Sequence, residues 1–450
     1  MFIFDFFIKA GPIVMIPVII TIIGLVFRLP LTKAFKSGLI IGIGFAGINL
    51  VIGLLTSNLG PAAKAMVKNF GIKLDVLDVG WGSIAAVTWS SPIIPILIGT
   101  IFVANIILLI LKATNTLDVD IWNYHHMAIV GVMTYFVTEN ILVSILAAAS
   151  MAIITFKLSD WSQPLVSKYF GIPGVSLPTV SAMSSLIIAV PLNWLIDKIP
   201  GVNKINLDMK NAKKYLGFFG EPMIMGLLLG CAIGALAKYD LTRIFQVGVN
   251  MAAVMVLIPK MVALFMEGLM PISEAAKKLT SKKFKGRKFF IGLDAAVVVG
   301  NPEVITTALI LIPLTILLAI VLPGNRLLPF ADLAVIPFRV ALVVALTNGN
   351  LFKNIIIGLG TMSAILLAGT ATSPVLTALA KTVGINVAGG GLISSFASTS
   401  LTASFLVFKV FTSNLWITLP VFIVIFAVVW IYMDVIRPKK THQSGDEVSL

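Results

Sequence analysis

The sequence has little charge and almost no cysteine. Charged residues make up 12% of its 450 residues, whereas hydrophobic residues make up 58%. A water-soluble protein needs far more polar surface than this, so the lipid bilayer must be the solvent of the chain. The single cysteine, Cys231, lies within an apolar stretch, so it can form no internal disulfide and does not indicate the redox compartment.

The signatures of several other function classes are also absent. The sequence contains no Gly-x-Gly-x-x-Gly, Walker loop or serine elbow in a plausible strand-turn-helix context, which argues against a nucleotide site within the chain. Adjacent histidines such as His125 and His126 point about 100° apart on a helix, and no third ligand has suitable spacing, so we expect no metal and no cofactor. The net charge of +14 comes from short loops between apolar stretches, where basic residues set topology, so we expect no nucleic-acid partner.

The chain does contain many long apolar stretches. A membrane-spanning helix needs roughly 20 predominantly apolar residues, and the sequence offers about ten to eleven such stretches. No alternating pattern of the outer-membrane barrel type occurs. We therefore predict an all-α polytopic membrane protein with about 11 transmembrane helices. The first stretch, from Ile13 to Phe27, lacks a basic leader and a cleavage site, so we expect a retained helix.

The sequence repeats itself at an offset of 210 positions. Residues 31–35 (Leu-Thr-Lys-Ala-Phe) match residues 241–245 (Leu-Thr-Arg-Ile-Phe), and the same offset pairs Pro92 with Pro302. Each half holds about five spans, and an odd number forces the second half to run upside down. The predicted organisation is a first inverted repeat (1–208), a second repeat (209–412), an extra C-terminal transmembrane helix (413–436) and a cytoplasmic tail (437–450).

The basic loops predict the orientation of the chain in the membrane. With the N-terminus outside and the C-terminus in the cytoplasm, four basic groups lie inside, including the run from Lys277 to Lys288. Three lysines argue against this orientation, because it leaves them outside: Lys64, Lys68 and Lys73.

Four polar breaks interrupt the long apolar stretches at matching positions of the two halves. They are residues 88–92 and 138–140 in the first half and residues 300–303 and 347–350 in the second. Such breaks leave backbone N–H and C=O groups without hydrogen-bond partners, and lipid cannot supply these partners. The breaks therefore indicate a protein-lined cavity and hence a substrate site.

Acidic and histidine side chains next to these breaks are the candidates for chemistry. A buried acid costs on the order of 3 kcal/mol by insertion scales, which makes Glu139, Asp294 and Glu303 candidates; the alternative is an acid at a helix end or in a structural pair. A histidine is suited to hydrogen bond a hydroxyl and take its proton; the alternative is a structural interfacial histidine. No arginine occurs at the breaks, which argues against an anionic substrate.

Several motifs carry a resemblance to a known family: residues 42–50 (Gly-Ile-Gly-Phe-Ala-Gly-Ile-Asn-Leu), 119–124 (Val-Asp-Ile-Trp-Asn-Tyr) and 300–305 (Gly-Asn-Pro-Glu-Val-Ile). Together they resemble the galactitol-type enzyme IIC membrane subunits of the bacterial phosphotransferase system, in the ascorbate-galactitol superfamily. The resemblance implies two inverted five-helix repeats with broken helices or re-entrant hairpins, a core domain plus a V-motif domain, and a homodimer in the lipid of the bacterial inner membrane.

The resemblance also implies group translocation. Galactitol or a related hexitol is carried inward and phosphorylated by a separate phosphocysteine-bearing IIB protein, which works with IIA. The chain would then be the membrane component of a protein-phosphocysteine–galactitol phosphotransferase. The alternative from another class is an ion-coupled secondary transporter, which shares inverted repeats and buried acids. A membrane-embedded enzyme or channel is a third interpretation.

The predicted site combines the breaks with the resemblance. His126 and Asp294 align with substrate contacts of the ascorbate-specific relative, and we expect them to act as the catalytic pair. The adjacent His125 leaves the identity of the active histidine open. The predicted substrate-binding residues are Asn123, His125, Glu139, Asn140, Asn301, Glu303 and Asn348.

Overall fold

The computed structural model describes residues 12–69, 71, 74–89, 91–118, 121–205, 207, 221–283, 289–329, 331–382 and 391–436. Helices account for most of them, as predicted. Five of these helices are long and apolar enough to cross a membrane: Ile141–Phe170, Val180–Lys198, Pro302–Val321, Leu351–Thr382 and Leu415–Asp434. The tail at 437–450 and the basic residues 284–288 lie outside the described residues.

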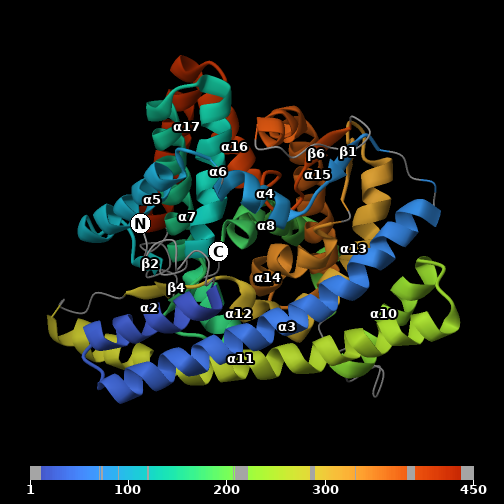
Figure 1. Ribbon diagram of the computed structural model, residues 1–450, viewed down its shortest axis with the longest axis horizontal. Helices are drawn as coiled ribbons and strands as arrows, with labels where there is room; N and C mark the ends of the chain where they lie inside the picture. The colour runs from blue at the N-terminus through green and yellow to red at the C-terminus, as the bar shows by residue number, and fades with distance from the viewer. Residues whose placement is uncertain are drawn as a thin grey trace.

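Four helices form one layer along the side of the molecule (Figure 1). They are α2 (Pro12–Val26), α3 (Leu31–Asn69), α10 (Pro222–Leu236) and α11 (Leu241–Lys283). The two long helices run antiparallel, because Asn250 donates a 2.9 Å hydrogen bond to Asn58 near one end while Gly268 packs against Ile41 near the other. A Cβ on Gly268 would lie 2.6 Å from Ile41, so this close approach requires glycine.

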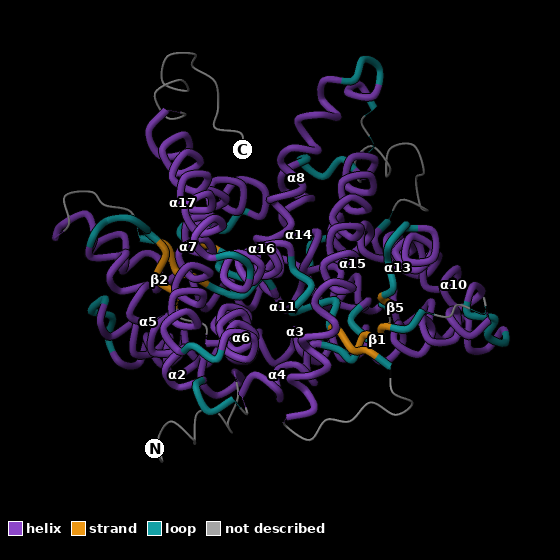
Figure 2. Tube along the Cα trace, turned by 90° about the horizontal axis from the view of Figure 1, so that it is seen from above, coloured by secondary structure: helices purple, strands orange, loops and turns teal. Residues whose placement is uncertain are grey.

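The remaining helices pack into a core beside this layer (Figures 1 and 2). Each polar break predicted from the sequence falls between two consecutive helices of the core. The helices of the first half are α4 (Trp81–Trp89), α5 (Ile94–Ile110), α6 (Ile121–Thr138), α7 (Ile141–Phe170) and α8 (Val180–Lys198). Those of the second half are α12 (Ala296–Val299), α13 (Pro302–Val321), α14 (Ile336–Leu346), α15 (Leu351–Thr382) and α16 (Thr402–Thr412).

Asparagine side chains start two of the helices that follow the breaks. Asn140 accepts hydrogen bonds from the Leu142 and Val143 backbone N–H groups at the start of α7. Asn301 does the same for Glu303 and Val304 at the start of α13. Side-chain caps satisfy the backbone donors that open a helix, so the chain can restart a helix directly after these two breaks.

Six short strands form two parallel sheets that the all-α prediction did not include. One sheet has the order β5 (Leu327–Leu328), β1 (Val76–Asp78), β6 (Leu392–Ser394), and the other has the order β2 (Thr116–Asp118), β4 (Phe290–Gly292), β3 (Val175–Ser176). Leu77 pairs with Leu328 and Ile393, and Ile291 pairs with Leu117 and Val175. In each sheet the central strand comes from one half of the chain and both edge strands come from the other half.

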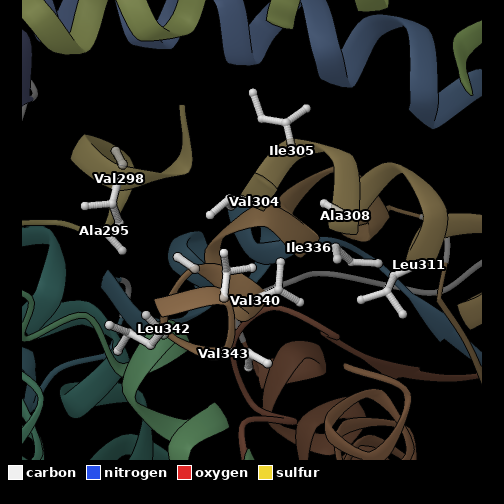
Figure 3. Packing of buried hydrophobic residues seen from close by; sticks show 14 of the residues in the cluster. Ala295, Val298, Val304, Ile305, Ala308, Leu311, Ile336, Val340, Leu342 and Val343 are labelled. Atoms are coloured by element: carbon white, nitrogen blue, oxygen red, sulfur yellow. The ribbon is translucent and has the colours of Figure 1, made fainter. Parts of the chain in front are cut away.

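Apolar side chains fill the space between the helices that follow β4 and β5. Val298 of α12, Val304 of α13 and Val340 and Val343 of α14 converge there (Figure 3), and all four are at most 2% exposed. Aliphatic packing of this kind fixes the positions of the short α12 and α14, which are too short to span a bilayer by themselves.

The C-terminal helix α17 (Leu415–Ile431) lies at the edge of the core: none of its residues is fully buried, and one face, including Phe422 and Phe426, packs against the core. Its end is attached to α7: Lys157 donates a 2.6 Å hydrogen bond to Asp434, and Trp161 donates one of 2.7 Å to the same carboxylate. A long apolar helix whose other face is exposed fits the predicted extra transmembrane helix at the C-terminus.

Candidate functional site

The two sheets gather buried carboxylates at their carboxyl ends. Parallel strands end at the same edge of a sheet, so the residues that follow them meet there. Asp78 is the last residue of β1 and Asp332 follows β5, and we call them, with Ser395 after β6, the Asp78–Asp332 cluster. Asp118 is the last residue of β2 and Asp294 follows β4, and we call them, with Asn123 and Thr179, the Asp118–Asp294 cluster.

Every carboxylate oxygen of the Asp78–Asp332 cluster accepts a hydrogen bond. Asp78 accepts from the backbone N–H groups of Gly80, Phe396 and Asp332 at 2.8–3.2 Å. Asp332 accepts from the Trp81 and Ala397 N–H groups and from the Ser395 hydroxyl at 2.8–2.9 Å. These bonds connect α4 of the first half to the loops that follow β5 and β6 of the second half, so the cluster holds the two halves together.

The Asp118–Asp294 cluster is less completely paired. Asp294 accepts a 2.7 Å hydrogen bond from the Ala296 N–H and a 3.4 Å bond from the Thr179 hydroxyl. Asn123 donates a 3.1 Å bond to Asp118, and its own Oδ1 atom has no hydrogen-bond partner among the described residues. Because Asp118 lies opposite Gly292 in the β2–β4 pair, the start of α6 and Asp294 belong to the same corner of the fold.

Both predicted histidines lie at this corner with unpaired nitrogens. His125 is 1% exposed, and neither of its ring nitrogens has a hydrogen-bond partner in the described part of the chain. His126 is partly exposed, and its Nδ1 atom also has no hydrogen-bond partner among the described residues. The ring centroids of the two histidines lie 5.1 Å apart. Buried polar atoms are normally paired, so this group of orphan atoms indicates a binding site for a polar ligand.

Arg339 of α14 is a buried charged residue that the sequence analysis did not single out. Its side chain is 1% exposed, and its Nη2 atom donates a 2.7 Å hydrogen bond to the Ala397 carbonyl. It interacts electrostatically with Asp332, Asp78, Asp294 and His126, and thus with both clusters. Its sequence signal is that of a charged residue within an otherwise apolar run, away from the four breaks.

The structure brings only some of the predicted residues together. Asn123, His125, His126 and Asp294 share one corner. Glu139 and Asn140 are exposed at the opposite end of α6, and 13 residues of helix separate Glu139 from His126, which is about 20 Å at 1.5 Å per residue.

The other predicted second-half residues lie at the two breaks of that half. Glu303 lies beside Gly349, because a Cβ built on that glycine would lie 3.6 Å from the Glu303 Cγ atom. Asn301 caps α13, and Asn348 is exposed in a left-handed conformation with φ of 54°. Within the described ranges, no group of three His, Cys, Asp or Glu side chains is arranged to hold a metal ion.

Comparison with known proteins shows to which family this chain belongs. The family described as "PTS system sugar-specific permease component" matches residues 6–391. The chain belongs to this family. It is 39% identical over 418 residues to the "PTS system galactitol-specific EIIC component" of Escherichia coli K12, a match that covers 93% of this chain and 92% of the relative. It is 38% identical over 386 residues to a "Putative permease IIC component" of the same organism, covering 86% and 88%.

Membership in the permease family confirms the resemblance drawn from the sequence motifs. Together with the apolar helices, it identifies an integral membrane protein of the phosphotransferase system. The ion-coupled transporter that the sequence left open receives no support from these matches.

Proposed function

We propose that this phosphotransferase-system permease carries galactitol or a closely related hexitol inward and presents it for phosphorylation. The observation that supports galactitol as the substrate is the 39% identity, over nearly the whole length of both chains, to a component named galactitol-specific. The buried polar corner supports it, because a polyol needs several hydrogen-bonding groups in place of water.

The proposed chemistry uses Asp294 and His126. The phosphoryl group leaves the phosphocysteine of a separate IIB subunit, the P–S bond breaks and a P–O bond forms at a primary hydroxyl of the polyol. Asp294 or His126 accepts the hydroxyl proton, and Asn123 and His125 hold further hydroxyls. The unpaired nitrogens of both histidines and the unpaired Oδ1 atom of Asn123 support these roles.

We further propose that the two halves of the chain are inverted repeats. Helices α2 and α10 start at Pro12 and Pro222, and α3 and α11 start at Leu31 and Leu241, which is an offset of 210 residues in both cases. The antiparallel course of α3 and α11 and the reciprocal strand exchange between the two sheets support an axis in the membrane plane. On this basis the layer of α2, α3, α10 and α11 is the V-motif domain.

The orientation with the N-terminus outside, the homodimer and the lipid contacts remain proposals. The basic run at 277–288 supports a cytoplasmic position for that loop, where a phosphorylated IIB subunit can meet it. A cysteine introduced at Ser281 should resist an impermeant thiol reagent added to intact cells; labelling from outside would refute the orientation.

Uptake into membrane vesicles tests the function. Vesicles with this chain, IIA, IIB and the general phosphocarriers are given radiolabelled galactitol, with and without phosphoenolpyruvate. We expect phosphorylated galactitol inside only when phosphoenolpyruvate and IIB are both present. Accumulation of unmodified galactitol driven by an ion gradient would overturn the proposal, and vesicles without the chain are the control.

A further inference from the structure

Arg339 is the largest side chain that the described part of the fold buries completely. Only one of its three nitrogens is paired, because Nη2 donates to Ala397 while Nε and Nη1 have no hydrogen-bond partner among the described residues. Those two atoms carry three N–H donors. A buried guanidinium with open donors is costly, so these donors call for a ligand that accepts hydrogen bonds.

The surroundings of Arg339 decide the charge of that ligand. Asp78, Asp294 and Asp332 all lie within electrostatic range of the guanidinium. One positive charge among three carboxylates leaves no excess positive charge to attract an anion, although the guanidinium alone would attract one. A hydroxyl group accepts a hydrogen bond from an arginine and donates one to a carboxylate, so an uncharged polyol matches this arrangement.

The position of Arg339 also connects it to the proposed reaction. Its electrostatic partners include both Asp294 and His126, the two groups proposed to take the hydroxyl proton. Arg339 on α14 therefore acts electrostatically on both members of the pair that the proposed reaction uses.

We propose that Arg339 binds the substrate directly through Nε and Nη1, and that the carboxylates around it restrict the site to uncharged polyols. This inference rests on the proposed function and adds to it the residue that determines specificity. The sequence argued against an anionic substrate because no arginine occurs at the breaks. In the structure an arginine is present away from the breaks, and the neighbouring acids offset its charge.

Equilibrium binding of radiolabelled galactitol to membranes without IIB tests the inference. Arg339→Gln should weaken binding about tenfold or more, as expected for the loss of charge-assisted hydrogen bonds. The matched control is Arg326→Gln, because Arg326 is exposed and pairs with Asp75 on the surface; we expect a change of less than about twofold there. An Arg339→Gln variant that binds galactitol within about threefold of wild type would overturn the inference.

Wild-type protein supplies a second test that no folding defect can obscure. Deoxyfluoro hexitols accept hydrogen bonds but cannot donate them at the substituted carbon, and deoxy hexitols do neither. At the carbon whose oxygen faces Arg339, the fluoro compound should bind at least about threefold better than the deoxy compound. No such carbon, or competition by galactonate equal to that by galactitol, would refute the proposal. Failure of wild-type protein to bind galactitol would instead refute the proposed function.

Discussion

The Asp78–Asp332 cluster and the Asp118–Asp294 cluster occupy the corresponding ends of two parallel sheets, yet their hydrogen bonding differs. In the first, both carboxylates are fully paired, mainly with backbone N–H groups. In the second, the Oδ1 atom of Asn123 has no partner among the described residues, and the same holds for the ring nitrogens of His125 and the Nδ1 atom of His126, which follow Asn123 on α6. The same strand arrangement therefore yields one structural cluster and one corner with hydrogen-bonding capacity left for a ligand.

Removal of a carboxylate from the structural cluster should have the largest effect. Asp332→Ala leaves the N–H groups of Trp81 and Ala397 without their acceptor and leaves Arg339 with one counter-charge fewer. Loss of one partner of a buried charged network costs about 3 to 5 kcal/mol. We expect a drop of that size in the free energy of unfolding in detergent. A variant as stable as wild type would contradict the structural role of the Asp78–Asp332 cluster.

The equivalent change in the other cluster should affect activity more than stability. Asp294→Asn keeps an oxygen for the Ala296 N–H but is a much weaker base. Phosphorylation of galactitol should fall by about 10²-fold or more, while binding weakens less. Near wild-type rates in both Asp294→Asn and His126→Ala would rule out this assignment of the site and leave the permease assignment intact.

The two adjacent histidines sharpen the assignment further. His126 is the partly exposed member, whereas His125 is buried. We expect His126→Ala to lower the phosphorylation rate about 10-fold or more and His125→Ala to lower it by less than about threefold. The reverse order, measured with purified IIB, would identify His125 as the active residue.

Residues at the far end of α6 should have small effects on transport. Asn140→Ala removes the cap of α7 and should cost about 1 kcal/mol of stability. Glu139→Gln should leave galactitol uptake within about twofold of wild type, because Glu139 lies about 20 Å along the helix from His126. A large loss of uptake in Glu139→Gln, at normal expression, would show that the site extends along α6.

The smallest effect is expected at the opposite, amino end of the β5-β1-β6 sheet. There Arg326 hydrogen bonds to Asp75 and lowers the pKa of that carboxyl below its usual 3.8. The pair therefore contributes to stability above pH 3.8 and loses that contribution as the pH falls through the lowered pKa. Both groups are exposed, so Arg326→Gln should barely change the melting temperature at pH 7; a large change would contradict this view.

Much of the site was predictable because it depends on the cost of polarity in lipid. Asp294 and the four breaks are conspicuous in apolar stretches, and each break falls between two helices. Arg339 obeys the same rule and was predictable from its apolar neighbours. Glu139 has the same signal, and the structure places it exposed at a helix end.

The sequence by itself determined that this chain is a membrane protein and where its helices break, because bilayer thickness and local composition fix these properties. Its motifs indicated the family, because similarity between relatives is carried by the sequence itself. Tertiary structure decided which polar residues meet. Strands of two or three residues are too short to show the alternation of apolar and polar side chains that predicts a strand. They also join segments that are distant in the sequence: the Asp332 N–H donates a hydrogen bond to Asp78 across 254 positions. Only that pairing leaves one carboxylate cluster saturated and places Arg339 within electrostatic range of both clusters.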